Sequence, residues 1–238
     1  EDLFLIGIVN VVDSMIAREV DCGVYLNAGR EVGVASTKCF TNQVIILSLI
    51  SIWFSQIHDK SNYKRKEFIT NLRQLPIHIK KTIEISKEYI HNYMNIVNKD
   101  NIFILGKGRS ESIANEAALK IKEISYIHAE GYSGSSLKHG PFALLSEDFP
   151  VILISPNNEH YVKMKNVYEE IKSRYAPILF ITDDKSCDLE NTLIIPYNKK
   201  FGDLLAIIPL QILAYNLSIE RNLNPDFPRN LAKSVVVE

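Results

Sequence analysis

Short apolar segments alternate with helical segments through the second half of this chain, and this alternation limits its fold more than any other feature. Strands are predicted at 102–105, 151–154, 178–182 and 193–196, and helices at 110–124, 160–174 and 201–221. The strands are nearly continuous runs of Val, Ile, Leu and Phe, which is typical of parallel strands buried on both faces. We therefore predict an α/β architecture in which helices cover a parallel sheet.

The first half of the chain shows a shorter version of the same order. Strands are predicted at 3–9 and 23–26, with a short helix at 14–19 and an apolar helix from 37 or 38 to about 56. The strand at 3–9 is expected to be buried. Val44–Phe54 is interpreted as a buried helix, since eleven residues are too few for a bilayer, which needs about 20. Residues 1–57 and 101–222 could be two copies of one α/β unit, with the first cut short.

Two helical segments connect the halves. Residues 60–73 and 77–97 have helical periodicity with charged faces, and Pro76 is expected to break them. The predicted domains are 1–60 as the C-terminal part of a first domain, 61–88 as a helical connector, 89–228 as a second domain and 229–238 as a C-terminal tail.

Composition excludes several classes of function. The formal net charge of −1 provides no basic field for nucleic acid or an anionic membrane. Glu1 and Asp2 stand where a signal peptide would have a basic region. Cys22, Cys39 and Cys187 lack C-x-x-C spacing, which fits reduced thiols better than a zinc site or disulfides. We expect a cytoplasmic protein that binds no metal, nucleic acid or membrane.

The carboxy-terminal tail, 226–238, contains one proline and no glycine, with an apolar run around Lys233. Pro228 favours an extended conformation at Phe227. The tail is therefore expected to lie against the body of the protein and to place Lys233 in a partly buried position. Burial can lower the pKa of a lysine from about 10.4 and make its amine able to form a Schiff base with a carbonyl. The alternative is a solvated lysine on a docked tail.

Two further features have both a structural and a chemical interpretation. Glu116, Lys120 and Glu123 share one helical face, where Lys120 and Glu123 could form an ordinary ion pair. Alternatively, Glu123 could be a general base that moves a proton between adjacent sugar carbons. His139 could transfer protons near neutral pH, or could be an ordinary surface or core residue. The turn at 106–108 and the loop at 133–136 could each bind an anion or simply turn the chain.

Three segments, in this order, carry a resemblance to a known family. They are EVGVASTK at 31–38, EAALKIKEISYIHAEGYSGSSLKHGP at 116–141, and DFPRNLAKSVVVE at 226–238. Together they resemble the isomerase half of the glutamine–fructose-6-phosphate aminotransferases. The resemblance implies two sugar isomerase (SIS) lobes with parallel sheets flanked by helices, of which the first lobe is incomplete.

The resemblance also implies a reaction. The family makes glucosamine 6-phosphate from fructose 6-phosphate and glutamine-derived ammonia, without a metal or organic cofactor. By similarity, Lys233 forms a Schiff base with C2 of the sugar, and Glu123, beside Lys120, transfers the proton between C1 and C2. His139 opens the sugar ring and reaches the active site of the neighbouring subunit of a homodimer. Residues expected by similarity to line the sugar site are Val34, Ser36 and Ala232.

Differences from the family pattern leave a competing interpretation open. An N-terminal glutaminase domain is expected in the full-length protein, and the family's first phosphate loop is expected just before residue 1. The chain is therefore expected to be a truncated and poorly active fragment. Ser135-Ser136 replaces a Gly-Glu pair, and Gly106-Lys107-Gly108 replaces Gly-Arg-Gly, which removes a bidentate fork. The alternatives are a non-catalytic SIS module that binds phosphosugars and a plain aldose–ketose isomerase.

Overall fold

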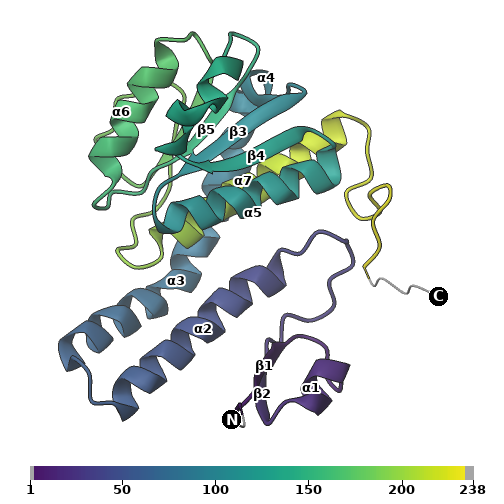
Figure 1. Cartoon of the computed structure of the whole chain (residues 1–238), viewed down its shortest axis with the longest axis vertical. Helices are drawn as coiled ribbons and strands as arrows, with labels where there is room; N and C mark the ends of the chain where they lie inside the picture. Colours follow the sequence, from purple (N-terminus) through teal and green to yellow (C-terminus); the bar gives the residue numbers. More distant parts are fainter. Residues whose placement is uncertain (1–2, 234–238) are drawn as a thin grey trace.

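The computed structural model describes residues 3–233, whose strands form one sheet of five strands and one of two. The larger sheet has the order β4-β3-β5-β6-β7, and every neighbouring pair in it is parallel (Figure 1). Its strands are β3 (Asn101–Gly106), β4 (His128–Ser133), β5 (Val151–Ile154), β6 (Ile178–Thr182) and β7 (Thr192–Ile194). The predicted parallel α/β architecture is confirmed.

Helices cover both faces of this sheet. Ile102 and Ile104 of β3 belong to the core cluster that contains α5 (Arg109–Ser125) and α7 (Gly202–Glu220). Phe103 and Leu105 alternate with them and pack in a second cluster with α6 (Tyr161–Lys172). Because successive side chains of a strand point to opposite faces, β3 is buried on both sides and contributes to both clusters.

Strand β4 was not predicted from the sequence. It lies at one edge of the sheet and pairs with β3 from Asn101↔His128 to Gly106↔Ser133. Its sequence, HAEGYS, lacks the apolar run that identifies the central strands. A Cβ added to Gly131 would lie 2.6 Å from the Cα of Asn115, so α5 crosses this strand in close backbone contact.

The first half of the chain forms the small sheet and one long helix. It contains β1 (Ile6–Val9), α1 (Met15–Glu19), β2 (Cys22–Tyr25) and α2 (Lys38–Ile57), and β1 pairs with β2 in parallel. A parallel pair of strands followed by a long apolar helix repeats the order β6-β7-α7. The prediction of a buried strand at 3–9 is wrong, because Gly7 alone is buried among the four residues of β1.

Helix α2 forms where it was predicted, but the prediction that Val44–Phe54 is buried is wrong. Within residues 3–233, α2 has no buried residue, and Trp53 is 55 % exposed. Figure 1 shows α2 beside α3 (Asn62–Tyr89). Phe40, Val44 and Ile45 of α2 pack against the core cluster that contains α5 and α7. Among the described residues, no further layer of structure buries the rest of the apolar surface of α2.

Helices α2 and α7 are both long and apolar enough, by length and composition alone, to cross a membrane. For α7, 72 % of that apolar window is buried inside the protein, so it is a core helix. Helix α2 carries Ser48, Ser51 and Ser55 on the side that faces α3. Composition alone is therefore weak evidence for a membrane span in either helix.

Helix α3 runs without interruption from Asn62 to Tyr89, so the predicted break near Pro76 is wrong. A proline inside a helix removes one backbone hydrogen bond and costs roughly 3 kcal/mol. Pro76 is exposed, whereas its neighbour Leu75 is buried, so the proline lies on the solvent side. Packing of the inner side against α7 compensates for the lost bond. A short 3₁₀ turn (Ile90–Tyr93) and α4 (Met94–Val97) lead on to β3.

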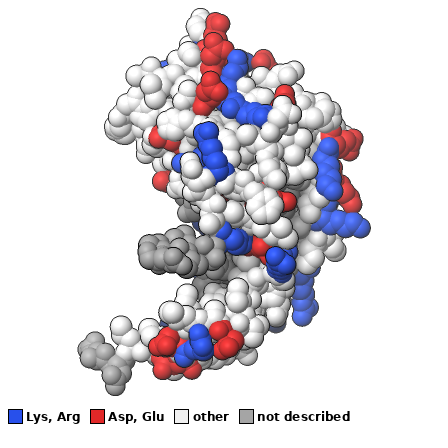
Figure 2. Space-filling view, turned by 90° about the vertical axis from the view of Figure 1, so that its right-hand side faces the viewer, with Lys and Arg blue, Asp and Glu red and all other residues white. Residues whose placement is uncertain are grey.

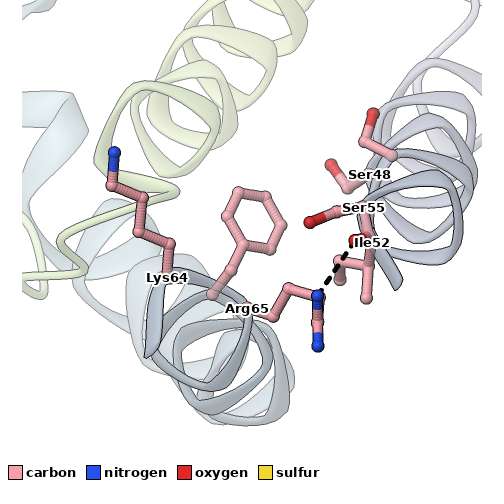
Figure 3. Close-up of a pocket in the computed structure, with 7 residues that line it drawn as sticks. Ser48, Ile52, Ser55, Lys64 and Arg65 are labelled. Atoms are coloured by element: carbon pink, nitrogen blue, oxygen red, sulfur yellow. Dashed lines mark hydrogen bonds between the residues drawn. The ribbon is translucent and has the colours of Figure 1, made fainter. Parts of the chain in front are cut away.

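The end of α2 is tied to the start of α3 by Arg65. Its guanidinium donates a hydrogen bond to the carbonyl of Ser55 at 2.9 Å and another to the carbonyl of Lys60. Figure 3 shows Arg65 reaching across to Ser55 over a hollow of about 170 Å³ between the two helices. A cation near the last carbonyls of a helix satisfies acceptors that have no partner within the helix.

We predict that Arg65→Met lowers the free energy of unfolding by about 1 kcal/mol, because the two carbonyls lose a charged donor. Urea unfolding followed by circular dichroism measures the change. Lys64→Met is the matched control, since it removes the same charge from the same turn. Equal effects of the two substitutions would show that net charge, and not the Arg65 contact, joins the helices.

Candidate active site at the junction of the lobes

The loop between β2 and α2 is organised by Glu31. Its Oε1 accepts hydrogen bonds from the backbone N–H of Thr37 at 3.0 Å and of Cys39 at 3.1 Å. These donors lie at the start of α2, where Thr37 makes no capping bond with its own side chain. Glu31 therefore caps α2 from six residues upstream, and the favourable position of a carboxylate at a helix start adds to the effect.

Ionisation of Glu31 follows from these contacts. Burial of its side chain, which is 8 % exposed, raises the pKa of the carboxyl group. Hydrogen bonds from Cys39 and Thr37, with the positive charge of Lys233, outweigh burial and lower this pKa to about 2. Burial and the neighbouring carboxylate raise the pKa of the Cys39 thiol to about 11, so Cys39 is not a reactive thiolate.

As far as Lys233, the carboxy-terminal tail lies against the body of the protein, as predicted, but Lys233 is exposed and not partly buried. The Nζ atom of Lys233 donates to the carbonyl of Gly33 at 2.8 Å and lies 3.4 Å from both the carbonyl of Val34 and Oε2 of Glu31. The Lys233 side chain is 43 % exposed. Residues 234–238 of the predicted tail lie outside the described residues.

The tail is also held at the end of α5. Tyr126, the residue that ends α5, has a left-handed backbone with φ of 59°. Its hydroxyl accepts a hydrogen bond from the backbone N–H of Arg229 at 2.7 Å, and the Arg229 guanidinium lies 4.2 Å from its ring centre. The tail also touches the loop before α2, because a Cβ added to Gly33 of the loop would lie 3.1 Å from Oδ1 of Asp226 in the tail. The tail therefore bridges the second lobe and the loop before α2.

The last turns of α5 carry a buried lysine between two carboxylates. Nζ of Lys120 lies 2.7 Å from Oε2 of Glu123 and 3.6 Å from Oε1 of Glu116, and its side chain is only 5 % exposed. Burial raises the pKa of Glu116, although the charge of Lys120 opposes this shift. The predicted shared face is confirmed, and the cluster is far less exposed than an ordinary surface ion pair.

A hollow of about 310 Å³ lies where the loop, α5, α7 and the tail meet. Its lining includes Glu31, Gly33, Gln211, Tyr215 and, from the last turn of α5, Ile124. Among the predicted sugar-site residues, Val34 and Ser36 are half-buried in the loop and Ala232 is exposed on the tail. The structure thus brings Lys233 and the loop together, while neither Lys233 nor Glu123 is among the residues that line this hollow.

His139 lies elsewhere in the chain. It ends a short 3₁₀ turn (Ser136–His139) that follows the carboxyl end of β4, and it is exposed. Glu123 lies near the end of α5, just before the chain enters the amino end of β4. A strand of six residues separates these two ends of the sheet, so one copy of the chain does not bring His139 beside Glu123.

The glycine turn after β3 lies at the carboxyl edge of the larger sheet. The two loops considered as anion sites meet here, since Lys107 donates to Ser135 and the N–H of Gly134 donates to the carbonyl of Gly106 at 2.8 Å. Gly108 has φ of 62°, and a Cβ added to it would lie 2.7 Å from Nε2 of His160. Packing and backbone geometry therefore explain this glycine without a bound anion.

Figure 2 shows basic and acidic residues interspersed over the face in view. Among the residues that the structure describes, no group of three or more His, Cys, Asp and Glu side chains could hold a metal ion.

The role of Glu31 is not apparent from the sequence. The segment EVGVASTK carries the family resemblance, but no pattern in it marks its first residue as functional. A carboxylate six residues before a helix start is outside the capping spacings that a sequence pattern reveals. The contact with Lys233 also joins residues that lie 202 positions apart.

Known proteins similar to this chain share one family. Residues 95–221 match the model of the SIS domain. The chain is 46 % identical over 98 % of its length to a probable glutamine–fructose-6-phosphate aminotransferase (isomerizing) of Acanthamoeba polyphaga mimivirus, and 37 % identical over 98 % to glutamine–fructose-6-phosphate aminotransferase (isomerizing) 1 of Rattus norvegicus. It spans 39 % and 35 % of the lengths of these relatives.

A solved structure agrees with this assignment. The C-terminal domain of glucosamine-fructose-6-phosphate aminotransferase from Francisella tularensis has a TM-score of 0.88 and 30 % sequence identity, and the match covers 94 % of this chain and 64 % of that one. The match to the family model covers more than half of the chain, and the fold and the relatives agree with it. The chain belongs to the SIS-domain family and corresponds to the isomerase portion of the glutamine–fructose-6-phosphate aminotransferases.

Proposed function

We propose that this chain is the isomerase part of an enzyme that makes glucosamine 6-phosphate from fructose 6-phosphate and ammonia released from glutamine. The observation that carries the proposal is the docked tail, which holds the amine of Lys233 against the loop before α2. A non-catalytic phosphosugar-binding module needs the fold but has no use for a lysine held in this way. The proposed protein is a cytoplasmic homodimer that also contains an N-terminal glutaminase domain.

In the proposed mechanism, His139, Lys233 and Glu123 each carry out a separate step. His139 transfers a proton to open the sugar ring, and Lys233 attacks the exposed C2 ketone to form a Schiff base with loss of water. Ammonia displaces the lysine, and Glu123 then moves a proton between C1 and C2 to give the aldose. The ammonium group of Lys120 lies 2.7 Å from Oε2 of Glu123 and stabilises the negative charge of this carboxylate. Val34, Ser36 and Ala232 line the sugar site.

A shared active site follows from the position of His139. This residue is exposed beyond the carboxyl end of β4, whereas Glu123 lies before its amino end, so a second subunit could receive His139. A homodimer would then supply His139 from one copy and Lys233 with Glu123 from the other.

Borohydride trapping tests the Schiff base. The protein that contains this chain is incubated with fructose 6-phosphate, reduced, and mapped by peptide mass spectrometry. We expect a hexose phosphate adduct on Lys233 that is absent from Lys233→Arg, which keeps the charge but cannot form the Schiff base. An intact protein that gives no adduct on Lys233 would be a phosphosugar-binding module and not this enzyme.

Glu123→Gln separates carbonyl capture from proton transfer. We expect the adduct on Lys233 to persist, while exchange of the C1 hydrogen with solvent falls by about 100-fold or more, as for loss of a general base. Deuterium incorporation into the product, measured by mass spectrometry, gives the exchange rate. Glu111→Gln, in the first turn of the same helix, is the matched control. Unchanged exchange in Glu123→Gln would assign the proton transfer to another group.

Mixing two inactive variants tests the shared site. A hybrid of a Lys233→Arg subunit and a His139→Asn subunit contains one intact site only if Lys233 and His139 act across the dimer. Random exchange should then restore about a quarter of the wild-type activity, since half of the dimers are hybrids with one working site of two. If His139 serves its own subunit, both sites of the hybrid are defective and mixing restores no activity.

A further inference from the structure

We propose that Glu31 is a positioning residue that couples the start of α2 to the nucleophilic Lys233. One oxygen of its carboxylate fixes the start of the helix, and the other lies beside the lysine amine. The inference rests on the proposed function, because it assigns Glu31 a part in directing the Lys233 amine toward a sugar carbonyl.

The two oxygens of Glu31 have separate partners. Oε1 accepts from the backbone N–H groups of Thr37 and Cys39, which are fixed by the first turn of α2. Oε2 lies 3.4 Å from Nζ of Lys233. The carboxylate is therefore a rigid link: its orientation is set by backbone donors on one side, so the position of the other oxygen is also set.

The ionisation of Glu31 supports this arrangement. Hydrogen bonds and the charge of Lys233 lower its pKa to about 2 against the effect of burial, so the group is a carboxylate throughout the neutral range. Only an ionised carboxylate can accept hydrogen bonds at both oxygens and attract an ammonium group at the same time.

Within the described part of the tail, the anchoring contact before Lys233 lies at Arg229. Arg229 is fixed on Tyr126 at the end of α5, four residues before Lys233. The contacts at Lys233 itself are the carbonyls of Gly33 and Val34 and the carboxylate of Glu31. Carbonyl oxygens at a half-exposed site accept hydrogen bonds from any donor. The charge of Glu31 is therefore the contact that favours the amine of Lys233 over water.

Glu31→Gln separates the two roles. The amide oxygen can still accept from Thr37 and Cys39, which places the amide NH₂ toward Lys233, where two donors then face each other. Capping of α2 is kept while the attraction to Lys233 is lost. The matched control is Glu67→Gln, which removes a carboxylate held by Lys199 and Lys200 at a different place in the molecule.

Lysine acetylation followed by mass spectrometry measures the effect of Glu31 on Lys233 in the absence of sugar. In Glu31→Gln we expect the acetylation rate of Lys233 to rise about threefold to tenfold relative to the exposed Lys163 of α6, as loss of one ion pair and its hydrogen bonds predicts. Glu67→Gln should leave this ratio at the wild-type value. An unchanged ratio in Glu31→Gln would overturn the inference, whatever the outcome with sugar.

Trapping with fructose 6-phosphate and borohydride measures how Glu31→Gln changes the formation of the Schiff base on Lys233. We expect the rate of adduct formation on Lys233 to fall about tenfold or more in Glu31→Gln, because a freer amine is less well directed at the carbonyl. Faster acetylation with undiminished trapping would show a tether with no positioning role and overturn the inference. Faster acetylation in a protein whose wild type traps no sugar would instead refute the proposed function.

A reciprocal measurement covers the case in which Glu31→Gln does not fold. In Lys233→Gln the carboxylate of Glu31 stays in place but loses its charged partner. If the two contacts are coupled, hydrogen exchange of the backbone amides of Thr37 and Cys39 should become faster, because coupling between two sites is mutual. Exchange at the wild-type rate would show that the helix cap and the lysine contact are independent, and the inference would fail.

Discussion

Close packing of α5 against α7 is the interaction on which the rest of the described structure depends. Ala114, Ala117 and Ala118 on α5 are at most 2 % exposed and share one core cluster with α7. Because protein interiors are close-packed, these small side chains fix how near the two helices approach. The position of α5 then decides where the Lys120–Glu123 pair lies and where Tyr126 receives the tail. A substitution in this interface would therefore also move the candidate site.

Helices α2 and α7 show that similar composition does not give similar burial. Both are apolar and of nearly equal length, and each follows a pair of parallel strands. Helix α7 is enclosed by α5, α3 and a five-stranded sheet, whereas α2 within residues 3–233 contacts α3 and the core of the second lobe along one side. Burial is a property of the layers around a helix, and these layers come from other parts of the chain.

The candidate site combines parts that are held with different rigidity. Lys120 and its two carboxylates lie on a helix whose opposite side is anchored in the core, so their geometry is nearly fixed. Lys233 lies on an irregular tail that is held by a few polar contacts and by the stacking of Arg229 on Tyr126. Such contacts contribute little individually in water, so the tail depends on several acting together.

The sequence by itself determined the parallel α/β architecture, most helix and strand positions and the shared face of Glu116, Lys120 and Glu123, because these follow from local periodicity and spacing. It did not determine the burial of residues 3–9 and 44–54, the continuity of α3 through Pro76 or the edge strand β4. Those depend on which layers cover an element, and tertiary packing can outweigh the cost of a proline. Only the tertiary structure decided that Glu31 joins the start of α2 to Lys233 and that His139 and Glu123 lie beyond opposite ends of β4. Contacts between residues so far apart in the chain leave no periodic signal, because they are fixed by how whole elements pack.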